Sequence, residues 1–192
     1  RHDLAVRLFQ SRQFPSWGYE VEQGATTVWE RWDSYTKEHG FNGASGNQNA
    51  SMNSFSHYSF GAVAEWMFRD LAGIASDGPG YRRIVIRPGV PSPSGNPDRA
   101  PVSWARASYH SIRGPIVSDW KRDGDRLTLR VEIPANTVAT VLLPAAGAAS
   151  VTEGGRPLAG AQGVKLVRME AGIAVMEVGS GRYEFESRIS SK

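Results

Sequence analysis

The sequence changes character at Asp77-Gly78-Pro79-Gly80, and this change limits the folds that are open to the chain. Before it lies the best helical pattern, residues 58–74, where apolar side chains recur on one face and Gly73 supplies a stop signal. After it come short alternating or β-branched runs, separated by turn residues and without a helical period between them. Short strands in close succession are typical of an antiparallel β-sandwich.

The second part of the chain supplies the expected strands of this sandwich. Asp123-Gly124 and Gly154-Gly155 are hairpin-type turn signals. Five prolines make residues 88–101 a loop rather than a strand. The runs interpreted as strands are 81–87, 102–108, 116–121, 126–133, 137–143, 164–168, 173–178 and 182–186.

The first part is expected to hold helices and one long loop. Residues 3–13 form a helical pattern with Asp3 as its expected N-cap. A second, short helix is considered over residues 24–35, and the Ser-, Asn- and Gly-rich stretch 34–56 predicts a loop. So few helices cannot enclose a core of their own. They either pack on the sandwich or end a larger α-helical domain, and we place the domain boundary between residues 77 and 78.

Composition excludes several classes of protein and site. The 192 residues suit one ordinary domain or two small ones. The absence of Cys excludes disulfides, thiolate metal sites and Cys nucleophiles. The four His show no metal-ligand spacing, and no glycine-rich nucleotide motif occurs. We therefore expect neither a metal nor a cofactor.

The charge pattern argues against nucleic acid as a partner. The net charge is +3, but the positive excess is diluted over residues 78–192 with acidic residues interspersed. Apolar runs are only a few residues long, far short of the ~20 needed to cross a bilayer, so no membrane is expected as a partner. The chain begins Arg1-His2-Asp3, and we expect it to be a piece of a longer protein of unknown compartment.

The segment WERWDS (29–34) is the first candidate for chemistry, because it places Glu30 between Trp29 and Trp32. A carboxylate beside indole rings is partly desolvated, which raises its pKa and suits it to proton transfer. The alternative is a partly buried Glu30 that pairs with Arg31 or another base. Asp33 is more simply read as a cap or an Arg partner.

His57, in NSFSHYSFG (53–61), is the second candidate, since a His at a loop-to-helix junction can hydrogen-bond a sugar hydroxyl. Its alternative is local hydrogen bonding alone. Trp17, Trp29 and Trp32 can either fill a core or form platforms for sugar rings. No GxSxG elbow supports a Ser nucleophile. Carboxylates with aromatic walls indicate cleavage of a glycosidic bond.

Five stretches of the chain, given below in sequence order, resemble the bacterial α-L-rhamnosidases of glycoside hydrolase family 78. The likeness covers nearly the whole chain, and its most specific motifs are GATTVWERWDS (24–34), NSFSHYSFGAVAEW (53–66) and GPIVSDWK (114–121). The five stretches span residues 14–34, 52–74, 79–90, 104–144 and 151–158.

This resemblance implies an α+β chain by content. Residues 1–77 would hold the last helices of an (α/α)6 catalytic barrel, and residues 78–192 an antiparallel β-sandwich. It also implies an inverting hydrolysis of terminal α-L-rhamnose from glycosides or polysaccharides. Glu30 corresponds to the general base that activates water, and His57 lines the rhamnose site. Trp17, Trp29 and Trp32 belong to the same aromatic neighbourhood.

The chain departs from the family pattern in two respects. The family's general acid belongs to an upstream motif that is absent from these 192 residues, and neither Glu20, Glu22, Glu38 nor Glu65 is a convincing replacement. The 26 residues between Glu30 and His57 also exceed the usual loop, and the excess lies in residues 37–51.

Three readings remain open at this point. The chain is part of an inverting rhamnosidase that is inactive alone, a non-catalytic carbohydrate-binding or structural module, or part of a related glycosidase for another sugar. In the first case the apolar helix faces, such as that of Phe60, Val63 and Met67, would need to be shielded from water by other protein surface. We then expect a companion chain of the same enzyme or self-association.

Overall fold

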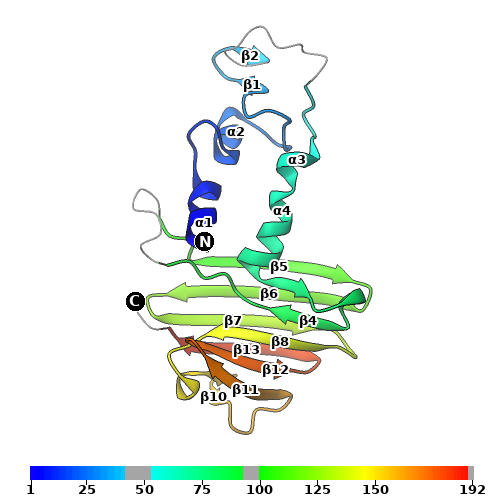
Figure 1. Cartoon of the computed structure of the whole chain (residues 1–192), viewed down its shortest axis with the longest axis vertical. Helices are drawn as coiled ribbons and strands as arrows, with labels where there is room; N and C mark the ends of the chain where they lie inside the picture. The colour runs from blue at the N-terminus through cyan, green and yellow to red at the C-terminus, as the bar shows by residue number, and fades with distance from the viewer. Residues whose placement is uncertain (42–52, 93–99, 190–192) are drawn as a thin grey trace. The chain divides into compact units, whose positions relative to one another are not determined.

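The computed structural model describes residues 1–41, 53–92 and 100–189, which form two compact units. One unit comprises residues 1–64 and 91–101, and the other residues 65–90 and 102–192 (Figure 1). Residues 42–52 of the predicted loop 34–56, and with them residues 42–51 of the expected excess, lie outside the described residues. The proline-rich loop is described only at its two ends, where it forms neither helix nor strand.

The first unit contains short helices and a small hairpin. Its elements are α1 (His2–Gln10), α2 (Trp17–Gln23), β1 (Tyr35–Thr36), β2 (Gly40–Phe41) and α3 (Tyr58–Gly61). The expected N-cap was wrong: α1 begins at His2, and the Asp3 carboxylate instead accepts a hydrogen bond from the Ser92 N–H at 3.0 Å. The helix considered over 24–35 was also wrong. Gly24 ends α2 in the left-handed region at φ 102°, and the chain beyond it runs through turns.

The long helix expected over residues 58–74 is broken into three pieces. These are α3, α4 (Val63–Trp66) and the π-helical turn η3 (Met67–Ala72). Gly73 ends it as expected, with φ 89°, and a side chain is excluded there. A Cβ at Gly73 would lie 2.2 Å from the Arg87 carbonyl oxygen.

The second unit is a β-sandwich whose six-stranded sheet is antiparallel throughout. Its order is β10-β9-β13-β7-β6-β5, and sequence pattern had predicted all but the two short strands at one edge. The bounds are β5 (Trp104–Ser111), β6 (Gly114–Asp123), β7 (Arg126–Ile133), β13 (Gly181–Arg188), β9 (Thr152–Glu153) and β10 (Arg156–Pro157).

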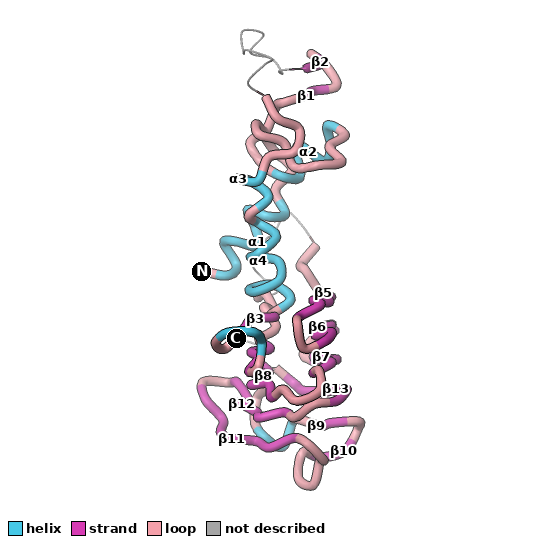
Figure 2. Tube along the Cα trace, turned by 90° about the vertical axis from the view of Figure 1, so that its right-hand side faces the viewer, coloured by secondary structure: helices cyan, strands magenta, loops and turns pink. Residues whose placement is uncertain are grey.

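The five-stranded sheet corrects the expectation of a purely antiparallel sandwich. Its order is β11-β12-β8-β4-β3, and β4 pairs with β8 in parallel, Arg83 opposite Val138. The chain can make this pair because β5, β6 and β7 of the other sheet lie between the two strands in sequence. The bounds are β3 (Ile74–Ser76), β4 (Arg83–Ile86), β8 (Val138–Pro144), β11 (Val164–Glu170) and β12 (Ile173–Val178). Figure 2 shows the strands of the two sheets as separate layers.

The sandwich core also receives the end of the broken helix. Trp120 is fully buried, and its Nε1 donates to the Leu71 carbonyl at 2.8 Å. Ser118, equally buried, donates to the Ala72 carbonyl at 2.6 Å. The last carbonyls of a helix lack partners within it, so these two side chains supply them. The motif GPIVSDWK therefore has a structural role in joining helix and sheet.

Among the described residues, no helix is long and apolar enough to cross a membrane.

Candidate active site

Helix α2 positions the first aromatic side chain of the site. The Ser16 side chain caps the helix by accepting from the Tyr19 N–H at 3.0 Å. Trp17 is therefore the first helical residue, and its Nε1 donates to the Phe60 carbonyl at 3.1 Å. This bond fixes the indole ring between α2 and α3, two helices far apart in the sequence.

Glu30 lies on a segment that pairs with residues 54–57. Its N–H donates to the Ser54 carbonyl at 2.8 Å, and the Ser54 N–H returns a bond to Glu30 Oε2 at 2.7 Å. The His57 N–H donates to the Val28 carbonyl at 2.8 Å, so the same pairing carries both candidate residues. The structure thus brings the Glu30 and His57 segments side by side. The Glu30 side chain is half-buried, with Oε2 held by a main-chain donor.

His57 caps helix α3 with its own ring. Its Nδ1 accepts from the Ser59 N–H at 3.3 Å, and its ring stacks on that of Tyr58 at 5.3 Å. A nitrogen that accepts an N–H carries no proton, so the proton of the neutral ring is on Nε2. His57 therefore has the local hydrogen bond considered as its alternative role, and among the described residues no hydrogen bond to its Nε2 is found.

The three tryptophans occupy two aromatic groups with different surroundings. Trp29 is only 5% exposed and packs edge-on against Phe55 and Tyr35, as a core residue does. Trp17 meets Trp32 edge-on at 5.3 Å, and Trp32 stacks on Phe60 at 3.7 Å. Trp17 and Trp32 are half-buried, so part of each ring remains open to solvent.

Glu20 is a carboxyl whose burial the sequence did not predict. It is 3% exposed, and burial raises its pKa from 4.5 to about 7, although a hydrogen bond from the Trp29 N–H opposes the shift. Its Oε1 has no hydrogen-bond partner among the described residues. Helical periodicity is the sequence signal that could have indicated this burial, because Glu20 stands three residues after Trp17 on the same side of α2.

A hollow of about 550 Å³ lies in this unit beside α2 and the β1–β2 hairpin. Phe14, Tyr19, Asp33 and His39 are among its lining residues, whereas Glu30 and His57 are not. Asp33 therefore faces this hollow, and no contact that the structure describes shows it as a cap. The described residues contain no cluster of His, Asp and Glu that could hold a metal ion.

Comparison with known proteins places this arrangement among the glycoside hydrolases. Residues 1–71 match the family model described as the bacterial α-L-rhamnosidase 6 hairpin glycosidase domain. Residues 73–156 match the model described as the bacterial α-L-rhamnosidase C-terminal domain. The chain belongs to the bacterial α-L-rhamnosidase family and matches its C-terminal portion.

Similar proteins carry the same name. An α-L-rhamnosidase of Streptomyces avermitilis is 42% identical over 95% of this chain, and one of Formosa agariphila is 35% identical over 98%. The crystal structure of the Streptomyces avermitilis enzyme complexed with L-rhamnose superimposes with a TM-score of 0.77, at 40% identity over 97% of the chain. The chain spans only 16% and 19% of the length of these two relatives.

Proposed function

We propose that this chain is part of an inverting α-L-rhamnosidase that hydrolyses terminal α-L-rhamnose from glycosides or polysaccharides. Membership of the family supports the reaction class, and the names of the similar proteins support the sugar. Glu30 is the general base in this proposal. The acid that protonates the leaving oxygen comes from residues outside these 192.

The observation that carries the assignment is the asymmetric bonding of the Glu30 carboxylate. Oε2 accepts the Ser54 N–H, whereas no hydrogen bond to Oε1 is found within the described residues. A general base needs one oxygen free for the water that it deprotonates and a fixed orientation relative to the sugar. Oε1 takes the proton, and the water oxygen attacks the anomeric carbon from the face opposite the leaving group.

His57 and the partly open tryptophans are proposed to hold the sugar. The Nε2–H of His57 donates to a ring hydroxyl, because its Nδ1 is already occupied by Ser59. Trp17 and Trp32 offer apolar ring surface for the sugar's C–H groups. Trp29, 5% exposed in this chain, is proposed to belong to the same aromatic neighbourhood of the sugar site, next to Glu30 in the sequence.

We further propose that residues 1–77 are the end of an (α/α)6 barrel and residues 78–192 the following sandwich domain. Apolar side chains on the described helices are exposed, which fits helix faces that another part of a barrel covers. The exposed set includes Leu4, Leu8, Val21 and Tyr58. A companion chain of the same enzyme, or self-association, would cover them. A clean monomer in light scattering would contradict this part of the proposal.

Glu30→Gln in the full-length enzyme that contains this chain is the decisive test. We expect kcat to fall by orders of magnitude with little change in KM, because Gln keeps the Ser54 bond but cannot take a proton. Glu22→Gln is the matched control, since Glu22 is an exposed carboxylate paired with Arg12. Near-normal turnover in Glu30→Gln would exclude Glu30 as the base.

The competing proposal is a non-catalytic carbohydrate-binding or structural module. It predicts that the 192-residue chain alone binds carbohydrate or stabilises the enzyme but does not cleave a glycosidic bond. The catalytic proposal makes the same prediction for the chain alone, because the general acid is proposed to lie outside it. The full-length enzyme separates the two. If Glu30→Gln and wild type hydrolyse an aryl α-L-rhamnoside equally, the result favours a non-catalytic module over a catalytic role for Glu30.

A further inference from the structure

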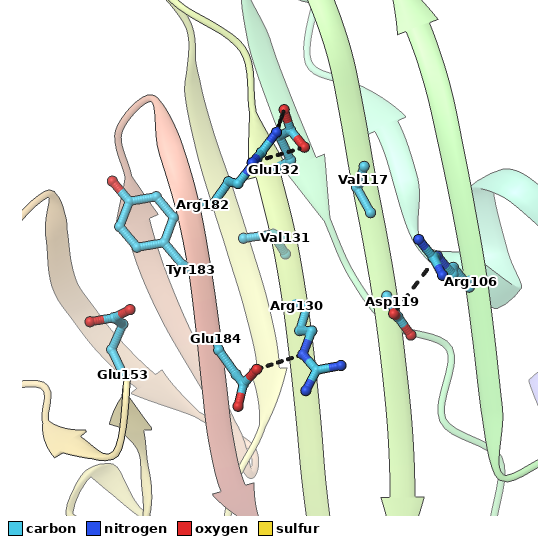
Figure 3. A pocket seen from close by; sticks show the side chains of 10 residues that line it. All are labelled: Arg106, Val117, Asp119, Arg130, Val131, Glu132, Glu153, Arg182, Tyr183 and Glu184. Atoms are coloured by element: carbon cyan, nitrogen blue, oxygen red, sulfur yellow. Dashed lines mark hydrogen bonds and ion pairs between the residues drawn. The ribbon is translucent and has the colours of Figure 1, made fainter.

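The outer face of the six-stranded sheet carries a hollow of about 400 Å³, within the range of ligand pockets, roughly 300–1,000 Å³. It lies wholly within the sandwich unit, over β5, β6, β7 and β13 (Figure 3). Its charged lining residues alternate in sign across β5, β6, β7 and β13. Those that carry the argument are Arg106, Asp119, Arg130, Glu132, Arg182 and Glu184.

Strand register arranges these side chains in rows. Arg106 stands opposite Asp119, Asp119 opposite Arg130 and Arg130 opposite Glu184, so one row crosses four strands. A second row places Glu132 opposite Arg182. Residues directly opposite each other on one face of a sheet lie close enough to interact. The structure records this as three cross-strand ion pairs.

Each guanidinium group in the hollow has a carboxylate neighbour on the adjacent strand. Arg182 Nε lies 3.1 Å from Glu132 Oε2, Arg106 Nε lies 3.8 Å from Asp119 Oδ2, and Arg130 Nε donates to Glu184 Oε2. Each Arg keeps further N–H donors, and each carboxylate keeps lone pairs.

The balance of charge selects the kind of ligand. Every Arg in the hollow has a carboxylate partner, and Glu153 gives the lining one carboxylate more than it has guanidinium groups. An anion therefore meets no field of opposite sign, and a cation meets only that single extra carboxylate. What the rows offer is a dense set of donors and acceptors at fixed spacing. A neutral ligand with many hydroxyl groups matches that set.

Aromatic and apolar surface adjoins the charged rows. Val117 and Tyr183 line the hollow, and the Glu153 carboxylate beside Tyr183 has no ion-pair partner among the described residues. Trp104 is 63% exposed and shares a face with Arg106, because residues two apart in a strand point to the same side. An exposed indole beside hydrogen-bonding groups suits the C–H face of a sugar ring.

We propose that this face of the sandwich is a binding site for a neutral oligosaccharide. The charged rows bind the sugar hydroxyls, and Trp104 and Tyr183 supply the apolar contact. The inference does not rest on Glu30 or on catalysis. It would give the sandwich a role in holding carbohydrate.

The test is an NMR titration of the ¹⁵N-labelled 192-residue chain. The probes are neutral oligosaccharides of rhamnose, of glucose and of mannose, with dextran sulfate as a polyanion. We expect at least one neutral probe to shift the Trp104 indole N–H and amides of β6, β7 and β13, with a Kd on the order of 1 mM. The affinity should barely change between low and high salt, because no net charge is neutralised.

Matched variants locate the site. Arg130→Ala and Trp104→Ala should each weaken binding at least about tenfold, which is 1.4 kcal/mol by the thermodynamic conversion. Arg168→Ala is the control, because Arg168 is paired with Glu170 on β11 of the other sheet. Far-strand signals that stay in place show that each variant is folded.

Several results would overturn the proposal. One is the absence of shifts on this face with all three neutral probes. Another is salt-sensitive binding of dextran sulfate alone, which would make the face an anion site. A third is equal loss in Arg168→Ala and Arg130→Ala. Shifts confined to the first unit, around His57, would support the proposed function and refute this inference, so the two fail separately.

Discussion

Among the described residues of the segment 1–64 the buried side chains are mostly polar, whereas the sandwich buries mainly aliphatic and aromatic ones. The first group includes Ser16, Glu20, Ser34 and Thr36 against Val6 and Trp29. In the sandwich, side chains such as Trp120, Phe185, Ile86 and Leu129 are 0% exposed. The two units therefore rely on different forces.

The sandwich has the apolar burial that stabilises an independent domain. The first unit relies more on buried hydrogen bonds and ring contacts, such as Ser34 Oγ bonded to Asn53 Oδ1 at 2.6 Å. Satisfied polar networks fix geometry, but a missing partner is costly in them. This difference indicates that the contacts of the unit with Glu30 mainly fix the geometry of its side chains, while those of the sandwich mainly stabilise the fold. Four substitutions can break or sharpen the contrast.

Trp120→Ala should have the largest effect. It removes a fully buried indole and its bond to the Leu71 carbonyl, so we expect the sandwich to lose about 3–5 kcal/mol of unfolding free energy. Urea denaturation of the chain measures the loss. Trp29→Ala is the comparison, since the ring contacts of Trp29 are to residues 35 and 55 of the first unit. An equal loss in the sandwich transition for both variants would contradict the contrast.

Glu20→Gln should change how the first unit responds to pH. Because the folded-state pKa is about 7 and the ordinary value 4.5, the unfolded chain ionises first as pH rises. The contribution of Glu20 to the free energy of unfolding is thus fully present below about pH 4.5. It falls by on the order of 3 kcal/mol as the pH rises from about 4.5 to 7. Gln should flatten this slope and make the unit more stable than wild type at pH 8.

Hydrogen exchange of the Glu30 and His57 amides, measured at pH 5 and pH 8, reports on Glu20→Gln. Glu22→Gln, at an exposed position of the same helix, should keep the wild-type slope. If the Glu20 variant also kept that slope, the raised pKa would be refuted.

Ser118→Ala should have a smaller effect, about 1–2 kcal/mol. The Ala72 carbonyl would lose a buried donor while the core keeps its volume. Denaturation of the chain gives the loss, and hydrogen exchange near Gly73 should rise. Ser108→Ala on the exposed side of β5 is the control, and a loss as large as that of Ser118→Ala would argue against the buried bond.

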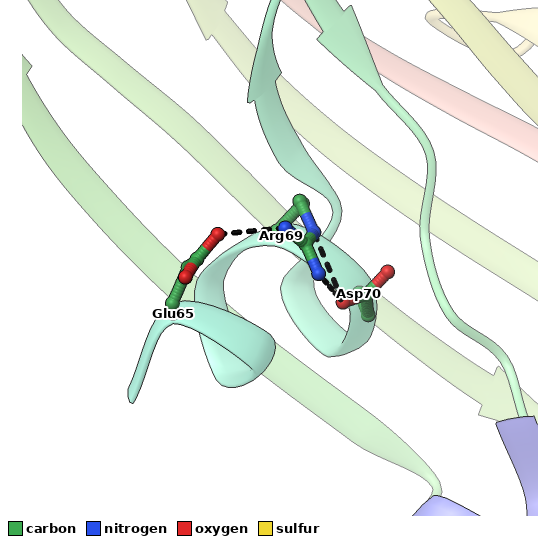
Figure 4. A network of polar contacts seen from close by, with 3 residues as sticks. All are labelled: Glu65, Arg69 and Asp70. Atoms are coloured by element: carbon green, nitrogen blue, oxygen red, sulfur yellow. Dashed lines mark hydrogen bonds and ion pairs between the residues drawn. The ribbon is translucent and has the colours of Figure 1, made fainter. Parts of the chain in front are cut away.

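Arg69→Ala should have the smallest effect. Arg69 bridges Glu65 and Asp70 on the surface of the broken helix (Figure 4), with contacts at 2.6 and 3.1 Å. Exposed ion pairs contribute little because water screens them. The melting temperature should stay within error of wild type. A clear drop would show that the π-helical turn depends on this network.

Sequence pattern predicted the sandwich better than the helices, for a physical reason. Alternation is a local signal, so Arg126–Ile133 and Ile173–Val178 were predicted with the bounds that the structure has. The parallel pairing of β4 with β8 was missed because it depends on the topology of both sheets. The π-helical turn at Met67 was missed because helical periodicity does not reveal a change of hydrogen-bond register.

The candidate site was predictable in part. Motif resemblance selected Glu30 and His57, and the structure pairs their segments through Ser54 and Val28. It did not reveal that Glu20 is buried, because burial of a single carboxyl depends on the phase of a two-turn helix. The roles assigned to these residues stay predictions until the variants are measured.

The parallel pair also bears on the order in which the sandwich forms. Arg83 pairs with Val138, and the consecutive strands β5, β6 and β7 lie between these two residues in the sequence. Contacts between neighbouring strands close short loops, whereas the β4–β8 contact closes a long one and loses more chain entropy. Refolding should therefore protect the amides of the β5–β6–β7 meander before those of β4. The π-helical turn η3, whose Leu71 and Ala72 carbonyls accept hydrogen bonds from Trp120 and Ser118, would then dock on a sheet that has already formed.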